Sequence, residues 1–201
     1  MSLGPAADLA YGANSQERYR ISKAWAAVSF GTALPDPGNG SPSPSPSGSP
    51  TGNPNSGNAL TNGDFEQGAT GWTQSANDIT NSNQRTPQGG SWYAWMMGYG
   101  SAAGETLAQN SIAVPATGSP KLTFWLKVTT QETGTTPYDT LKVTVNGATL
   151  ATYSNANAGA GYVQKTVDLG ACRGQSVNLQ FAGQEDAHLA TTFLLDDVSI
   201  G

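Results

Sequence analysis

A proline- and serine-rich stretch, residues 36–58, divides this chain into parts that must fold separately. It holds no large apolar side chain, no aromatic ring and a single charged residue, so ordering it would cost more conformational entropy than burial could return. Proline alternating with serine favours an extended, semi-rigid spacer. We therefore expect three segments: residues 1–34, a spacer at 35–58, and one independent domain at 59–201.

The composition is typical of an extracellular β protein. Charged residues make up 11% of the chain and the formal net charge is −5, which argues against nucleic acid or an anionic membrane as a partner. No apolar run approaches the roughly 18 residues that a transmembrane helix requires. We expect a secreted monomer, in which the single cysteine, Cys172, is a small, partly buried side chain near a loop.

Residues 14–31 predict one amphipathic helix. Asn14 and Glu17 have the spacing of a capping box, and Gly31 provides a stop. Between them the apolar side chains recur at helical spacing, at Ile21, Ala24, Trp25 and Val28. One short helix is marginal alone in water, so this helix needs another surface against which to bury its apolar stripe.

The segment around this helix resembles the extreme C-terminus of thermolysin-like zinc metallopeptidases. The matching residues are Tyr11, Gly12, Ser15, Gln16, Glu17, Ala24, Ala27 and Val28. The resemblance implies a parent zinc endopeptidase whose catalytic domain, with its zinc, lies outside this chain. An unrelated terminal helix is the alternative.

The catalytic zinc motif of such enzymes is absent from this chain. His188 is the single histidine, and no H-E-x-x-H motif occurs. The opening residues, MSLG, resemble an expression-vector start rather than a signal peptide, so we expect a piece cut from a longer secreted protein. The chain itself is therefore not expected to be an enzyme.

Residues 59–201 carry strand signals at short, even spacing. Strand-like segments occur at 122–130, 139–145, 148–154, 162–170, 176–183 and 191–200, with further candidates at 59–67, 91–98 and 106–114. The pair Asn146-Gly147 supplies a tight hairpin turn between two of these segments. About eight to ten strands without a helical period predict an all-β fold, an antiparallel two-sheet jelly-roll sandwich.

The ends of this domain resemble those of a jelly-roll superfamily. Residues 62–72 (NGDFEQGATGW) and 193–200 (FLLDDVSI) resemble its first and last strands. The superfamily includes MAM-like domains, galactose-binding-like domains and several families of carbohydrate-binding modules. Residues 91–98, 123–128 and 137–147 also resemble the MAM-like modules attached to secreted bacterial peptidases.

The last strand places a carboxylate among apolar residues. Period-two alternation puts Asp196 on one side with Leu194, Val198 and Ile200, and an inward-facing carboxylate is costly unless it is paired or bound to a cation. Such a position predicts either a metal ligand or a carboxylate that accepts hydrogen bonds from backbone N–H groups.

Calcium is the expected metal, because clustered carboxylate oxygens suit this cation. Glu66 and Asp64 lie near the start of the domain, and first and last strands are often neighbours in such sandwiches. In the resembled families the residues that match Glu66 and Asp196 often hold a structural calcium. We predict a calcium site at Glu66 and Asp196, with Asp64 and Asp139 as lesser candidates.

Exposed aromatic rings are the expected platforms for a carbohydrate. Trp125 falls opposite the apolar side chains of its strand and is the first candidate, followed by Trp95 and Tyr99. Trp72 is expected in the core. Trp92 cannot share a face with Trp95, so the sequence does not predict a continuous row of rings. Residues 183–192, with Glu185, Asp186 and His188, predict either a metal or ligand loop or a solvated turn.

Three functions compete. The first is a non-catalytic module that holds a secreted metallopeptidase on an extracellular polymer or protein matrix and so raises its local concentration. The second is a structural or processing domain that binds no ligand and is removed by cleavage at the spacer. The third and weakest is a glycosidase that uses paired carboxylates.

Overall fold

Residues 58–201 are the part of the chain that the computed structural model describes. The helix expected at 14–31, and all but the last residue of the spacer, lie outside the described residues. Both stay predictions.

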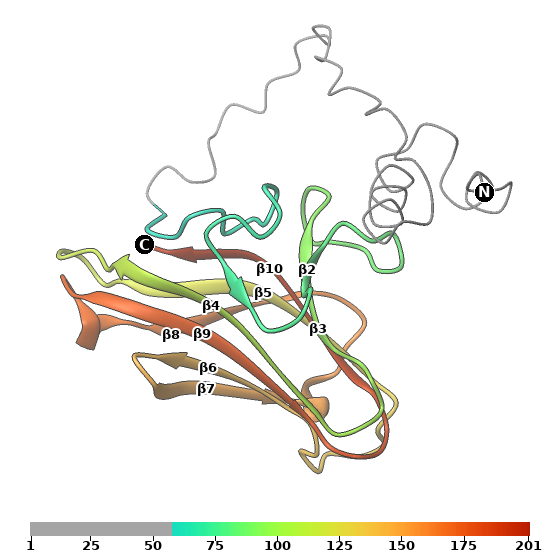
Figure 1. The fold of residues 1–201 in the computed structure, drawn as a ribbon. Coiled ribbons are helices and arrows are strands. Elements are labelled where there is room, and N and C mark those ends of the chain that lie inside the picture. The colour runs from blue at the N-terminus through green and yellow to red at the C-terminus, as the bar shows by residue number, and fades with distance from the viewer. Residues whose placement is uncertain (1–57) are drawn as a thin grey trace, which may run out of the picture. The chain divides into compact units, whose positions relative to one another are not determined.

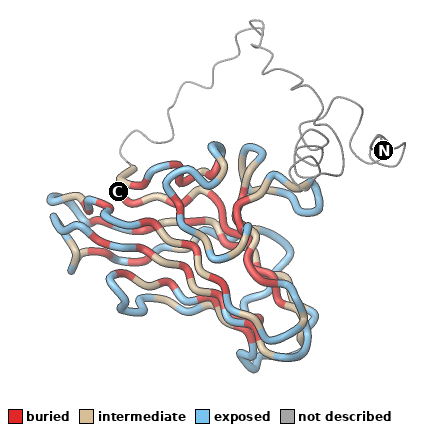
Figure 2. The backbone as a smooth tube through the Cα atoms, viewed as in Figure 1, coloured by how far each residue is buried: buried red, intermediate tan, exposed pale blue. Residues whose placement is uncertain are grey.

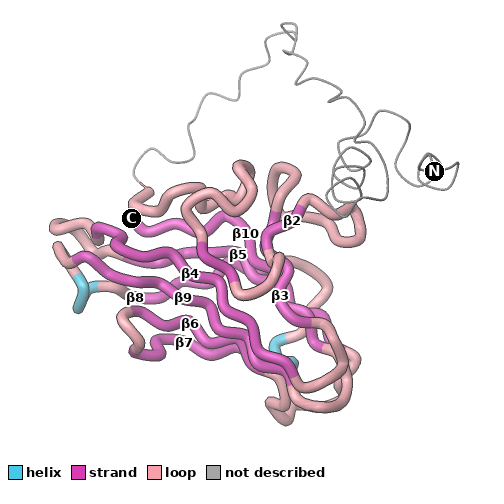
Figure 3. The backbone as a smooth tube through the Cα atoms, in the orientation of Figure 1, coloured by secondary structure: helices cyan, strands magenta, loops and turns pink. Residues whose placement is uncertain are grey.

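Two antiparallel five-stranded sheets form the described domain (Figures 1 and 3). The first sheet contains, in spatial order, β1 (Thr73–Gln74), β4 (Ala103–Ala113), β9 (Ser176–Glu185), β6 (Thr140–Val145) and β7 (Ala148–Ser154). The second sheet contains, again in spatial order, β2 (Ile79–Thr80), β3 (Tyr93–Met97), β10 (Thr191–Ile200), β5 (Lys121–Thr130) and β8 (Val163–Asp168). The helical elements described in residues 58–201 are two single turns, η1 (Asn155–Asn157) and η2 (Gly170–Cys172). The predicted all-β jelly-roll sandwich is confirmed.

The core lies between the sheets and follows the alternation read from the sequence. In β5 the side chains of Leu122, Phe124, Leu126 and Val128 are buried, whereas those between them are half-buried. Phe124 of the second sheet meets Phe181 of the first edge to face, with ring centroids 5.2 Å apart. Figure 2 shows buried stretches along the strands and exposed stretches in the loops.

The hairpin between β6 and β7 turns at Asn146 and Gly147, as predicted. Both residues have positive φ angles, 50° and 81°. This is the backbone that a two-residue hairpin turn of the type I′ class requires, and asparagine followed by glycine adopts it at the least cost.

Residues 59–67, a predicted strand, instead form a series of turns, so that prediction is wrong. Asn62 and Phe65 both have positive φ angles, which no regular strand accommodates. The side chain of Asn62 holds the turns by donating to the carbonyls of Gly68 and Thr70 and accepting from the N–H of Gln67. The segment still lies beside the last strand, because the N–H of Ala59 donates to the carbonyl of Ile200 at 2.9 Å.

A β-bulge changes which residues of β10 share a face. Pairing with β5 shifts register between Asp196 and Ser199, and Asp197 has a φ of 48°. Phe193, Leu195, Val198 and Ile200 belong to the hydrophobic cluster between the sheets, whereas Leu194 is equally buried but lies outside that cluster. The prediction that Asp196 shares a side with Val198 and Ile200 is therefore wrong, because the extra residue inverts the alternation at Asp197.

No helix in residues 58–201 has the length and apolar character needed to cross a bilayer.

Candidate functional site

Two tryptophans of the second sheet lie on its outer face, on either side of β10. Trp95 of β3 pairs with Leu194, and Trp125 of β5 pairs with Asp196, two residues further along β10. Both side chains are half-buried. Trp72 is in the core as predicted; its Nε1 donates to the carbonyl of Asn62 at 2.9 Å.

The loop that joins β2 to β3, residues 81–92, crosses the same outer face. The backbone N–H groups of Gln88 and Gly89 donate to Oδ2 of Asp196, at 2.8 and 3.1 Å. Asp196 is completely buried, and its Oδ1 accepts from the N–H of Asp197 at 2.8 Å. The loop is therefore held to the face at Asp196, the residue of β10 that pairs with Trp125. The two tryptophan rings line two separate cavities.

A cavity of about 570 Å³ opens beside Trp95. Two of the three predicted ligand-binding residues, Trp95 and Tyr99, line it. The guanidinium carbon of Arg85 lies 4.7 Å from the centroid of the Trp95 ring, a stacking distance that holds the indole in place. The Tyr99 side chain is 57% exposed, so its ring is available to a ligand.

Two buried carboxylates line the same cavity, and sequence reasoning missed both. Asp78 is 2% exposed and Glu105 is 5% exposed. Glu105 accepts hydrogen bonds from the N–H of Met97 at 2.6 Å and from the hydroxyl of Tyr99, whereas neither carboxylate oxygen of Asp78 has a hydrogen-bond partner. The sequence indicates that Glu105 is buried, because alternation along β4 places it on the same side as buried Leu107 and Gln109. Asp78 stands outside any periodic segment.

Burial and proximity raise the pKa values around this pair. The pKa of Asp78 rises from 3.8 to about 7, first because the carboxyl group is desolvated and second because of the negative charge of Glu105. The pKa of Tyr99 rises to about 12, chiefly through its hydrogen bond to Glu105. The cavity therefore combines aromatic rings with two carboxyl groups, and that of Asp78 changes from a hydrogen-bond donor to an acceptor near pH 7.

Glu185 anchors the loop that carries Tyr99. Its carboxylate is buried and accepts from the N–H groups of Gly98, Tyr99 and Gly100, and also from the N–H of Thr191. The nearby His188 is exposed, with its Nδ1 3.5 Å from Asp186. Residues 183–192 are predicted from the sequence to form either a metal or ligand loop or a solvated turn. The exposed position of His188 fits the solvated turn.

A second carboxylate group gathers at the predicted calcium site. The pKa of Asp197 is raised first by burial and then by the charges of Asp64 and Glu66, so these three carboxylates lie near one another. Oδ1 of Asp64 is buried without a hydrogen-bond partner. The pKa of Asp196 is raised to about 6 by burial, although N–H groups of the loop counteract part of the shift. Among residues 58–201, no three side chains of the metal-binding types converge closely enough to form a cage by themselves.

Trp125, the first predicted platform, lies beside this second group. Trp125 lines a cavity of about 310 Å³ together with Asp64, Asp197 and Gln164. It does not share a cavity with Trp95 and Tyr99.

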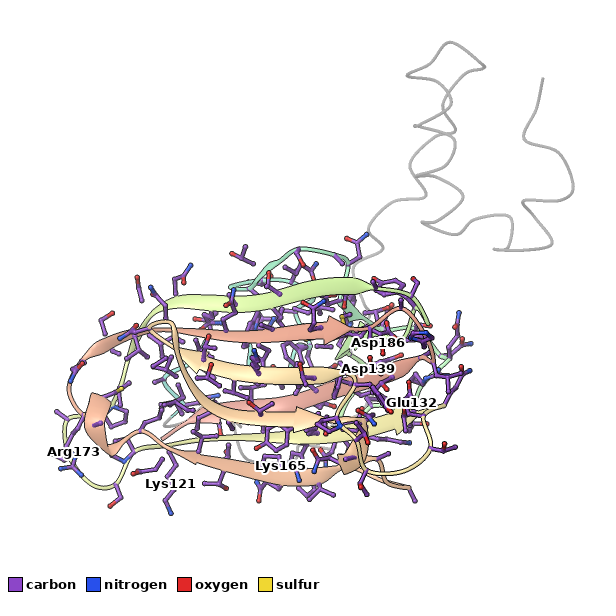
Figure 4. All side chains as sticks on the ribbon, turned by 90° about the horizontal axis from the view of Figure 1, so that it is seen from below. Lys121, Glu132, Asp139, Lys165, Arg173 and Asp186 are labelled. Carbon is purple, nitrogen blue, oxygen red and sulfur yellow. The ribbon has the colours of Figure 1, made fainter. Side chains whose placement is uncertain are left out.

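Asp139 lies elsewhere in the domain. Its Oδ1 accepts from the N–H of Asp186 at 2.8 Å, and its Oδ2 is buried without a partner. Asp186 lies between β9 and the start of β10, whereas Asp197 lies near the far end of β10, about 20 Å along the strand from Thr191 at about 3.3 Å per residue. Figure 4 shows Asp139, Asp186 and Glu132 at one end of the domain and Lys121 and Arg173 at the other.

Glu66 clamps the end of the β2–β3 loop, and this clamp gives a first prediction. Oε1 of Glu66 accepts from the N–H groups of Ser91 and Trp92, and a Cβ at Gly90 would overlap the same carboxylate. Gly90 also has a φ of +58°. We expect Gly90→Ala to displace Glu66 and lower the free energy of unfolding by about 2 kcal/mol. Gly159→Ala is the control in urea unfolding, because a Cβ there meets nothing within 4 Å; equal effects of the two changes would contradict the clamp.

The fold of this chain is similar to that of several solved structures. No protein-family model and no curated protein matches the chain. The solved structure of TmCBM61 in complex with beta-1,4-galactotriose is 16% identical, with a TM-score of 0.52, covering 72% of this chain and 97% of that one. A family 16 carbohydrate-binding module is 18% identical (TM-score 0.48; 72% and 99% covered). The K3 cleaved adhesin domain of Lys-gingipain from Porphyromonas gingivalis is also 18% identical (TM-score 0.45; 69% and 95% covered). The chain thus shares the β-sandwich jelly-roll fold of a solved carbohydrate-binding module.

Proposed function

We propose that residues 59–201 form a non-catalytic module that binds an extracellular carbohydrate polymer. The observation that carries this proposal is the cavity beside Trp95, where two aromatic side chains meet two buried carboxylates. Sugars stack their apolar faces on aromatic rings and donate hydroxyl hydrogens to carboxylates, so the two kinds of side chain serve the two faces of a sugar. The galactotriose in the TmCBM61 complex is a ligand of this chemical class.

The parent protein and a structural calcium belong to the same proposal. The resemblance of residues 11–28 to the end of thermolysin-like peptidases supports a secreted zinc metalloendopeptidase as the parent, which the module would tether to its substrate matrix. The buried oxygen of Asp64, with Glu66 and Asp197 near it, supports a calcium at the predicted site. Asp196 would then support the site by fixing the loop rather than by coordinating the ion.

Retention on insoluble polymers tests the proposal. The full chain is incubated with cellulose, chitin, insoluble galactan, bacterial cell wall, collagen and elastin, and the bound fraction is measured. We expect retention on a polysaccharide, and we expect Trp95→Ala to weaken it about tenfold, which corresponds to the roughly 1.4 kcal/mol of one stacking contact. Trp125→Ala is the matched control on the smaller cavity.

Each other outcome has a distinct meaning. Loss of retention with Trp125→Ala alone would move the binding site to the cavity beside Asp64 and Asp197. Retention on collagen or elastin alone would replace the carbohydrate with a protein matrix. Retention on none of these materials would overturn the binding function and leave the structural or processing domain as the function to test.

A further inference from the structure

The carboxyl group of Asp78 is buried, and the groups that act on it are a neighbouring acid, Glu105, and the backbone N–H groups of Ala76 and Asp78. The residue is 2% exposed, lines the cavity beside Trp95, and has no hydrogen-bond partner on either carboxylate oxygen. A carboxylate taken out of water in this way is strongly unfavourable unless it is protonated, paired or bound to a metal ion. Protonation meets this requirement below about pH 7, and a cation in the cavity would meet it above that pH.

The neighbour of Asp78 makes this requirement stronger. Glu105, 5% exposed, adds a second negative charge beside it. Within residues 58–201 neither carboxylate forms an ion pair with a lysine or arginine. Arg85 stacks on Trp95, which lines the same cavity, but forms no ion pair with either acid. Two buried acids thus face one cavity, and neither forms an ion pair with a cation of the described domain.

The carboxylate oxygens of Asp78 and Glu105 keep lone pairs that could bind a cation. Neither oxygen of Asp78 has a donor at hydrogen-bond geometry, although the N–H groups of Ala76 and Asp78 lie near enough to lower its pKa. Each oxygen of Glu105 accepts one hydrogen bond, from Met97 N–H or from the Tyr99 hydroxyl. A carboxylate oxygen has two lone pairs, so Glu105 keeps acceptor capacity after these bonds. The two donors also fix its orientation, as the outer partners of metal-binding carboxylates do. A proton shared by the two acids would satisfy one oxygen of each and leave the others unpaired.

We propose that Asp78 and Glu105 bind one calcium ion, whose remaining coordination positions face the cavity of Trp95 and Tyr99 and are completed by a pair of sugar hydroxyls. Calcium takes six to eight oxygen ligands in flexible geometry, so two protein carboxylates leave several positions for water or for a ligand. The ion is separate from the structural calcium proposed near Glu66, because Asp78 and Glu105 line the cavity of Trp95, whereas Asp64 and Asp197 line the cavity of Trp125. The sugar half of this inference rests on the proposed function; the calcium half does not.

The cation would decide which sugars bind. A neutral sugar with two adjacent hydroxyl groups would replace two waters on the ion while its ring lies against Trp95. Polymer binding is then calcium-dependent, because the sugar hydroxyls are held by the ion and not by the two carboxyl groups directly. This defines the ligand class as polysaccharides with accessible vicinal diols.

Calcium titration of the full chain, without any polymer, tests the metal half. Isothermal titration in metal-free buffer at neutral pH is carried out on the wild type, Asp78→Asn, Glu105→Gln and Asp64→Asn. Asp168→Asn, at an exposed carboxylate, is the control. We expect Asp78→Asn and Glu105→Gln to remove the same binding event, or weaken it at least tenfold, while Asp64→Asn and Asp168→Asn retain it. Circular dichroism checks that each variant is folded, and calcium binding by folded Asp78→Asn and Glu105→Gln equal to that of the wild type would overturn the site.

Retention on the polysaccharide, with calcium and with chelator, tests the sugar half. We expect chelator and Asp78→Asn each to abolish retention, and calcium to restore it for the wild type alone. Retention that persists in chelator would overturn the bridging ion while leaving the carbohydrate-binding function intact. Absence of retention in both conditions, together with intact calcium binding, would overturn the carbohydrate function and leave the metal site standing.

Discussion

Glu185→Ala is expected to lower the free energy of unfolding by about 3 kcal/mol and to abolish binding at the Trp95 cavity. The carboxylate is 1% exposed and accepts from four backbone N–H groups, one of which belongs to fully buried Thr191. An unsatisfied buried donor costs about 1–3 kcal/mol, and the three N–H groups of residues 98–100 recover part of their loss from water. The loop that presents Tyr99 would then lose its anchor.

Urea unfolding and polymer retention measure the two effects of this change. Gln184→Ala is the matched control, because Gln184 is the neighbouring residue of β9 and is exposed. We expect the control to change stability by no more than about 0.5 kcal/mol. If Glu185→Ala behaved like its neighbour, the four hydrogen bonds would not anchor the loop.

The stability of the calcium-free protein is expected to fall as the pH rises, through Asp78. Its pKa is about 7 in the folded state and near 3.8 when unfolded, so between these values the folded state binds more protons than the unfolded state. Stability is then greatest at about pH 4, decreases toward pH 7 and is level above it, with a total change of about 2–4 kcal/mol from this group. Asp196 and Asp197, whose pKa values are also raised, act in the same direction.

The difference between the wild type and Asp78→Asn isolates this effect from other acids. Thermal unfolding is followed from pH 4 to pH 8 in chelator. We expect the two proteins to be about equally stable at pH 4 and the variant to be the more stable at pH 8, because it carries no buried charge. Asp168→Asn should follow the wild-type curve at every pH. Curves for wild type and Asp78→Asn that run parallel would show that Asp78 is not a desolvated acid.

Much of the fold could be predicted from local sequence patterns, because these patterns report local geometry. The alternation in residues 122–130 places Trp125 opposite the core, and the pair Asn146-Gly147 forces the β6–β7 turn. The bulge at Asp197 has no comparable signal. A single inserted residue inverts the face of every later residue in a strand. The sequence therefore predicts Asp196 on the core face, whereas the structure places it on the outer face.

The candidate site was predicted only in part, because it joins residues from distant segments. Trp95 and Tyr99 were recognised by residue type alone. Asp78, which precedes β2, and Glu105 of β4 become neighbours only once β2 and β4 are placed in their sheets. The alternation of β4 places Glu105 among buried residues, but nothing in the sequence indicates which carboxylate stands beside it.

The hydrogen bond from Ala59 to Ile200 places the first and last residues of the sandwich side by side. Such a domain can be transferred between proteins as one folded unit. It can be joined to a host at a single point, repeated in tandem, or inserted into a surface loop, and in none of these arrangements need a strand of the sandwich change its neighbours. Recombination that moves residues 59–200 between genes would therefore transfer the Trp95 cavity whole, independently of the protein that receives it.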